Sequence, residues 1–275
     1  MTPRLAVRKT YKMYINGAFV RSESGRSYRP EGNADMNLPL GSRKDLRDAV
    51  RAARQAQSKW ASLTAMNRGQ ILYRIAEMVD ARRDEFQEML GGKPRHAQEV
   101  EDTVTTFVWY AGWTDKFQAV LGTVDPVAGP YFTFTLPEPT GVVGIVPPPS
   151  HSLLGCARHL APVLATGNTA VILAGDADTR PQLLLGEILA TSDVPQGVAN
   201  ILTGSVKELL PWLSAHMDVN AIDLSGCPEP LLADAERNAA ENVKRVYRFQ
   251  PVAPLSPYVM AEAIEAKTVW HPLAR

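Results

Sequence analysis

One strand–helix–strand unit near the middle of the chain, residues 139–174, constrains the fold more than any other stretch. An apolar run at 142–146 follows a glycine, as expected for a buried strand. Apolar residues then recur at helical spacing through 150–165, and Gly167-Asn168 suits the end of a helix. A second apolar strand follows at 169–173. The pattern predicts two neighbouring strands joined by a helix.

The chain beyond this unit repeats the same alternation. It predicts helices at 181–190, 206–216 and 229–242, and strands at 198–202, 219–224 and 245–249. Such alternation predicts an α/β fold with a parallel, doubly wound sheet and helices on both faces. Sheets of this kind bind ligands at the carboxyl ends of their strands, so we expect any site just after residues 146, 173, 202 and 224.

The first half of the chain is predicted to be mostly helical. Residues 12–20, with a turn at Asn16-Gly17, and an extended piece at 27–29 predict a small hairpin layer. Apolar spacing predicts three amphipathic helices, at 42–60, 65–90 and 94–121, and we interpret the aromatic residues of the third as helix packing. An alternating strand is expected at 131–135.

Composition excludes several classes of function. The 275 residues hold 29 basic and 29 acidic side chains, which gives no electrostatic reason to expect nucleic acid or a membrane as partner. We find no apolar run long enough for a membrane span and no secretory signal, so we expect a cytoplasmic protein. Cys156 and Cys227 lie far apart without histidines at ligand spacing, so we expect neither a disulfide nor a metal site.

A series of motifs, in order, resembles the N-terminal cofactor-binding part of the NAD(P)-dependent aldehyde dehydrogenase superfamily. The motifs are YINGAFV at 14–20, AVRAARQAQSKW at 49–60, RGQILYRIAEMVDARRDE at 68–85, PTGVVGIVPP at 139–148, LAPVLATGNTAVIL at 160–173 and DVPQGVANILTG at 193–204. The resemblance implies that residues 1–130 and 140–249 form a Rossmann-like, NAD-binding-type domain.

The C-terminal segment at 256–272 resembles the closing segment of a full-length member of that superfamily. The catalytic domain that carries the nucleophilic cysteine is expected between this segment and the strand near 245, and we interpret it as absent. The resemblance further implies that residues 131–144 and 256–275 form an oligomerisation β-arm. Its expected contact residues are Tyr131, Phe132, Phe134, Val269 and Trp270.

Several positions that match functional residues of the superfamily carry side chains without the required chemistry. The asparagine that helps to hold the oxyanion corresponds to Pro149, and the general base corresponds to Phe249. The lysine that holds the adenosine ribose corresponds to Leu173, which leaves Asp176 as the one acceptor of that group.

The turn that faces the pyrophosphate is altered as well. It corresponds to Gly226-Cys227, and the later glycine of that motif corresponds to Leu231, preceded by Pro228 and Pro230. Proline removes amide donors and leucine blocks close approach of a backbone to a phosphate. Cys227 near a helix start is more simply a small buried thiol, although a helix N-terminus can activate one.

Together these positions predict a pseudoenzyme with no catalytic residues and no bound cofactor. We expect it to pair with a full-length aldehyde dehydrogenase, or with itself, through the arm, as a structural or regulatory subunit. The alternative is a compact oxidoreductase that binds NAD(P) in a non-standard way, and a third possibility is a small-molecule sensor. We interpret His159 as a surface or packing residue, and Lys244 and Arg245 as residues of a solvated strand edge.

Overall fold

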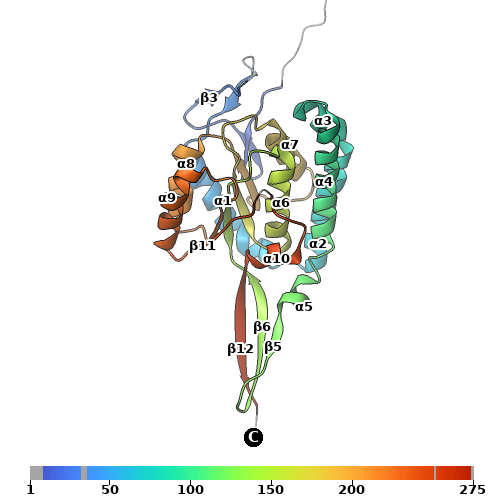
Figure 1. Ribbon diagram of the computed structural model, residues 1–275, viewed down its shortest axis with the longest axis vertical. Coiled ribbons are helices and arrows are strands. Elements are labelled where there is room, and N and C mark those ends of the chain that lie inside the picture. Colours follow the sequence, from blue (N-terminus) through green and yellow to red (C-terminus); the bar gives the residue numbers. More distant parts are fainter. Residues whose placement is uncertain (1–8, 32–35, 251, 274–275) are drawn as a thin grey trace, which may run out of the picture.

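A seven-stranded sheet runs through the body of the molecule in the order β11-β10-β7-β8-β9-β1-β2 (Figure 1). The computed structural model describes residues 9–31, 36–250 and 252–273, so the ends of the predicted domain and arm, at 1–8 and 274–275, lie outside the described residues. The parallel strands are β7 (Val142–Ile145), β8 (Thr169–Leu173), β9 (Ala199–Leu202), β10 (Ala221–Asp223) and β11 (Arg245–Tyr247). The remaining two, β1 (Met13–Ile15) and β2 (Ala18–Val20), extend the sheet in antiparallel fashion beyond β9.

Helices cover both faces of this sheet, because its parallel strands are apolar on both sides. One apolar cluster joins the sheet to α6 (Ser152–Ala165) and α7 (Arg180–Ala190), with α2 (Ala65–Ala81) and α4 (Pro94–Ala111) packed outside them. The other joins it to α1 (Arg43–Ala61), α8 (Val206–Ala215) and α9 (Glu229–Ala240). The predicted doubly wound α/β architecture is confirmed.

The N-terminal part differs from the prediction in two ways. The helix expected at 65–90 breaks at Arg82, whose backbone leaves the helical region, into α2 and α3 (Arg83–Leu90). The helix expected at 94–121 likewise divides into α4 and α5 (Phe117–Leu121), separated by a turn that starts at Gly112. The apolar period continues across both breaks, so spacing alone did not reveal them.

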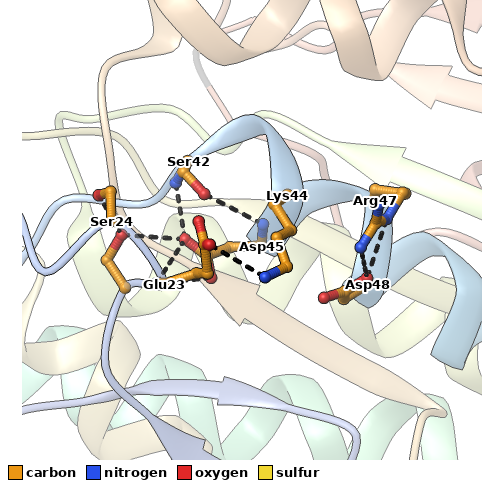
Figure 2. Close-up of polar contacts among 8 residues, drawn as sticks. Glu23, Ser24, Ser42, Lys44, Asp45, Arg47 and Asp48 are labelled. Atoms are coloured by element: carbon orange, nitrogen blue, oxygen red, sulfur yellow. Dashed lines mark hydrogen bonds and ion pairs between the residues drawn. The ribbon is translucent and has the colours of Figure 1, made fainter.

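The expected hairpin layer is also wrong in its pairing. The β1–β2 hairpin belongs to the main sheet, while β3 (Ser27–Tyr28) pairs with β4 (Leu38–Pro39) in a separate two-stranded sheet. Figure 2 shows how this region is fixed to the start of α1. The buried Asp45 carboxylate accepts from the amide of Ser42 at 2.8 Å and from the amide of Glu23 at 3.1 Å, while Ser42 Oγ accepts from the Asp45 amide at 3.3 Å. This capping box holds the preceding loop on the helix.

A narrow three-stranded arm projects from the body (Figure 1). It consists of β5 (Thr123–Asp125), β6 (Tyr131–Pro139) and β12 (Ile264–Pro272), and β12 pairs with β6 over all nine residues. Residues 142–144, which the prediction assigned to the arm, lie instead in β7 of the main sheet. The short helix α10 (Pro257–Ala261) precedes β12 and contacts α5 and α6.

The buried amide of Asn168 joins the root of the arm to the body. Its Oδ1 accepts from the Gly141 amide at 2.7 Å, and its Nδ2 donates to the Ala263 carbonyl at 2.6 Å and to Thr166 Oγ1 at 2.8 Å. The single Asn168 side chain, just after the end of α6, therefore holds all three partners. The direction in which the arm leaves the body is therefore set by buried hydrogen bonds.

The prediction of a solvated edge at Lys244 and Arg245 is wrong. Lys244 is 6% exposed, and its Nζ donates to the carbonyls of His216 at 2.9 Å and Val219 at 2.6 Å. Burial lowers the pKa of this ammonium to about 8. Arg245 is half-buried, and it donates to the Ala261 carbonyl at 3.2 Å and pairs with Glu265 at 3.0 Å at the root of the arm.

Candidate functional site: the carboxyl edge of the sheet

The strand order reverses between β7 and β10, which is where a doubly wound sheet offers a ligand crevice. In this chain the two loops that leave these strands touch each other. The Gly226 amide donates to the Val146 carbonyl at 2.7 Å, and the Val146 amide donates to the Asp223 carbonyl at 2.9 Å. A Cβ at Gly226 would lie 2.0 Å from the Pro147 carbonyl oxygen. The backbones of the two loops are therefore in contact at the switch point.

The end of β8 and the loop after it are packed against other parts of the chain. Leu173 is fully buried and shares an apolar cluster with Val146, Leu202 and Leu224. Tyr28 reaches over from β3, and its hydroxyl donates to the Ala177 carbonyl at 3.0 Å and lies 2.8 Å from Thr179 Oγ1. Burial raises the pKa of this phenol. Asp176, the one remaining acceptor predicted here, lies exposed on the loop.

The turn after β10 leads into α9 through two prolines. Pro228 occupies the N-cap position and Pro230 lies in the first turn, while the Leu231 amide donates back to the Pro228 carbonyl at 2.9 Å. The Leu231 side chain packs on the apolar cluster that contains Leu173 and Cys227. Two prolines thus remove donors that a helix N-terminus otherwise presents to an anion.

Burial disfavours the ionised form of both cysteines. Both are free and buried, and burial raises the pKa of the Cys156 thiol to about 12. Burial also raises the pKa of the Cys227 thiol, the largest contribution there, and its Sγ lies 3.5 Å from the Pro228 carbonyl oxygen. A thiol must ionise to attack a carbonyl. The interpretation of Cys227 as a small buried thiol is supported.

A buried polar network lies directly beneath this edge, and sequence reasoning missed it. His159 Nδ1 of α6 lies 2.6 Å from Asp223 Oδ2 at the end of β10, and both side chains are at most 1% exposed. Asp223 Oδ1 also accepts from the Ser225 amide at 2.9 Å and from Ser225 Oγ at 2.5 Å. His159 Nε2 accepts from the Ala253 amide at 3.3 Å, so the neutral ring with its proton on Nδ1 satisfies every partner.

The network holds the chain that follows β11. Ser225 Oγ accepts from the Phe249 amide at 2.8 Å, and the Gln250 amide group donates to the Ser225 carbonyl at 3.1 Å. The Phe249 ring lies 6.1 Å from the His159 ring. Phe249, expected at the general-base position, is therefore a packing residue on this network. Two tethers, at Phe249 and Ala253, fix the connection from β11 toward α10.

The N-terminus of α6 is capped by a carboxylate from another helix, that of Glu99 in α4. His151 at the N-cap makes no capping bond. Instead Glu99 Oε1, from α4, accepts from the amides of Leu153 at 3.1 Å and Leu154 at 3.2 Å. A carboxylate at this position complements the positive end of the helix dipole. Pro149 lies exposed in the turn just before this helix.

The predicted positions thus fall into two groups. One group lies in a packed region at the carboxyl edge and consists of Leu173, Gly226, Cys227 and Leu231. The other group, Pro149 and Asp176, is exposed on separate loops. His159 and Glu99 carry no motif, because a histidine or glutamate on a helix gives no sign of its distant partner. Within the described ranges, no cluster of three or more His, Cys, Asp or Glu side chains is arranged to hold a metal ion. Among the same residues, no helix is long and apolar enough to cross a membrane.

The parallel sheet, its switch point and its flanking helices define a Rossmann-like α/β fold. The model of the aldehyde dehydrogenase family matches residues 21–248, and the chain belongs to that family. It is 34% identical to human retinal dehydrogenase 2, with 89% of this chain and 49% of that protein covered. It is 31% identical to the mitochondrial benzaldehyde dehydrogenase of Antirrhinum majus, with 91% and 48% covered.

Solved structures give the same assignment. The NAD+ complex of aldehyde dehydrogenase from Bacillus cereus superposes with a TM-score of 0.78 at 27% identity, covering 87% of this chain and 50% of that one. HpcC from Thermus thermophilus superposes with a TM-score of 0.81 at 28% identity, covering 87% and 48%. The chain thus spans about half the length of the curated relatives it matches.

Proposed function

We propose that this chain is a non-catalytic member of the aldehyde dehydrogenase family that associates with a full-length member as a structural or regulatory subunit. One observation carries the proposal. The loops after β7 and β10, between which the fold would receive a dinucleotide, are in direct backbone contact, with Gly226 against Pro147. The residues at this edge do not fit a dinucleotide held across the switch point.

The surroundings of that contact support the same proposal. An enlarged crevice would have to separate the loops after β7 and β10, but the buried His159–Asp223 pair and Ser225 tie the second loop to α6 and to the segment after β11. Leu173 offers no donor for ribose hydroxyls. Both thiols are held in their protonated form by burial. These features support a role other than aldehyde oxidation.

The arm supports association as the remaining role. It stands clear of the body in Figure 1 and leaves large apolar side chains exposed, including Tyr131, Phe132, Leu136 and Trp270. Large apolar side chains exposed on a sheet that projects from the body support an interaction site. Of the five contact residues predicted, Phe134 and Val269 are half-buried within the arm and the other three are exposed. As part of the proposal we assign the protein to the cytoplasm, where its two separate thiols would stay reduced.

Calorimetric titration with NAD+ and with NADP+ tests the cofactor part of the proposal. We expect no saturable heat up to about 1 mM, a concentration far above a micromolar dissociation constant. A full-length aldehyde dehydrogenase titrated in the same buffer is the positive control. Saturable micromolar binding would overturn the proposal and favour the compact oxidoreductase.

Native mass measurement tests the partner part. We expect the chain, mixed with full-length aldehyde dehydrogenases from its own source organism, to give a complex that contains both chains. The same mixture with an arm-deleted chain, in which β5–β6 and β12 are each replaced by a short turn, is the control. A chain that stays separate from every such enzyme would contradict the proposed association.

A further inference from the structure

We propose that the outer edge of β12 is the docking edge of the arm and that it pairs, antiparallel, with β12 of a second copy of this chain. The claim goes beyond the proposed function, because it names an occupant that needs no other protein. β12 is bonded to β6 along one side over nine residues, and in the described part of the chain no strand lies along its other side. A long unpaired edge is a template for another strand.

The two edge strands of the arm differ in length and in proline content, and this difference favours β12 as the docking edge. The opposite edge is β5, which has three residues and is followed directly by Pro126. A short strand that ends in proline is a common way of blocking an edge. β12 has no proline before its last residue, Pro272, and it carries the strand-forming residues Thr268, Val269 and Trp270 in sequence.

The sequence of β12 is self-complementary in one register. When Thr268 lies on the two-fold axis, all nine residues pair, and Glu265 faces His271 of the second copy. Lys267 faces Val269, and the small Ala266 faces the large Trp270. Moving the axis to Lys267 places two ammonium groups opposite each other and leaves two residues unpaired. No like charges meet with Thr268 on the axis, and opposed threonines are a favourable cross-strand pair.

This register also keeps the apolar face of the arm continuous. Val269 pairs with Phe134 in the arm, and Val124, Phe134 and Val269 lie in one row across its three strands. With Thr268 on the axis, directly opposed residues project from the same side of the sheet, so the two copies present these rows on one face. A shift by one residue would place them on opposite faces.

Charge exchange on the axis tests the pairing. Native mass measurement of the wild type should give about twice the 30.1 kDa of one chain. Thr268→Lys and Thr268→Glu should each raise the dimer dissociation constant about tenfold or more at low salt, because like charges meet on the axis. An equimolar mixture should restore a dimer with one chain of each kind. Thr123→Lys, the same change on the exposed β5 edge, should leave the dimer intact.

Cross-linking tests the register. Mixed under mild oxidation, Glu265→Cys and His271→Cys chains should form a disulfide-linked dimer, while each variant alone should form little, since the two positions face each other only across the axis. The natural thiols are buried and provide a low background. Unchanged circular dichroism of every variant verifies folding. A monomeric wild type, or a dimer unaffected by Thr268→Lys, overturns the pairing.

The outcomes separate this inference from the proposed function. A monomer that still binds a full-length aldehyde dehydrogenase would overturn the inference and support the function. A β12-dependent dimer that ignores such enzymes would do the reverse.

Discussion

The carboxyl edge of the main sheet and the outer edge of the arm differ in how their backbone amides and carbonyls are hydrogen-bonded. At the carboxyl edge, the Gly226 amide is bonded to the Val146 carbonyl and the Phe249 amide to Ser225 Oγ of the same chain. Along β12, one side of a nine-residue strand is left without a partner strand among the described residues. The two edges therefore differ in whether their backbone groups are bonded within the chain or open to a further strand.

Breaking the buried network should have the largest effect on the body. His159→Ala leaves the Asp223 carboxylate buried with one partner fewer, and we expect a loss of about 3–5 kcal/mol of unfolding free energy. Urea denaturation followed by circular dichroism measures it. His159→Gln, which can donate to Asp223 and accept from Ala253, should recover part of the loss.

The matched control lies on the arm. His271 is exposed on β12, and His271→Ala should change the unfolding free energy by less than about 0.5 kcal/mol. Equal losses in His159→Ala and His271→Ala would contradict the contrast between a tightly bonded edge and an open one.

Some of these features could be predicted from the sequence and others could not. Period and punctuation predicted the alternating strands and helices of the sheet, since the spacing of apolar residues within one element is a local property of the sequence. Motif order predicted the family. The contacts beneath the carboxyl edge could not be predicted, because they depend on Gly226 meeting Pro147 and on His159 meeting Asp223, both separated by more than sixty residues. The breaks at Arg82 and Gly112 were missed because apolar spacing continues through them.

Removing the internal anion at α6 should have a smaller effect. Glu99→Ala takes away the acceptor for the amides of Leu153 and Leu154, and we expect a loss of about 1 kcal/mol, as for other helix caps. Glu99→Gln keeps an oxygen acceptor and should lose less. The measurement is again urea denaturation.

An arm glutamate provides the comparison. Glu138 pairs with Lys267 at 2.9 Å on the exposed sheet, and Glu138→Ala should cost less than about 0.5 kcal/mol. A larger loss for Glu138→Ala than for Glu99→Ala would mean that the arm, and not the carboxyl edge, depends more on its polar contacts.

A pH dependence is expected at Lys244, for which Lys267 of the arm is the matched residue. Burial lowers the pKa of Lys244 to about 8 in the folded state, so above that pH the folded chain releases a proton that the unfolded chain still holds. Stability contributed by this group therefore rises between about pH 8 and the ordinary lysine range near 10.4. Relative to Lys244→Met, the wild type should become more stable as the pH is raised from about 7 to about 10. Paired thermal melts at both pH values measure the difference. Lys267→Met, which removes an exposed ammonium, should follow the wild type, and a wild type that loses stability relative to Lys244→Met would contradict the buried position of this amine.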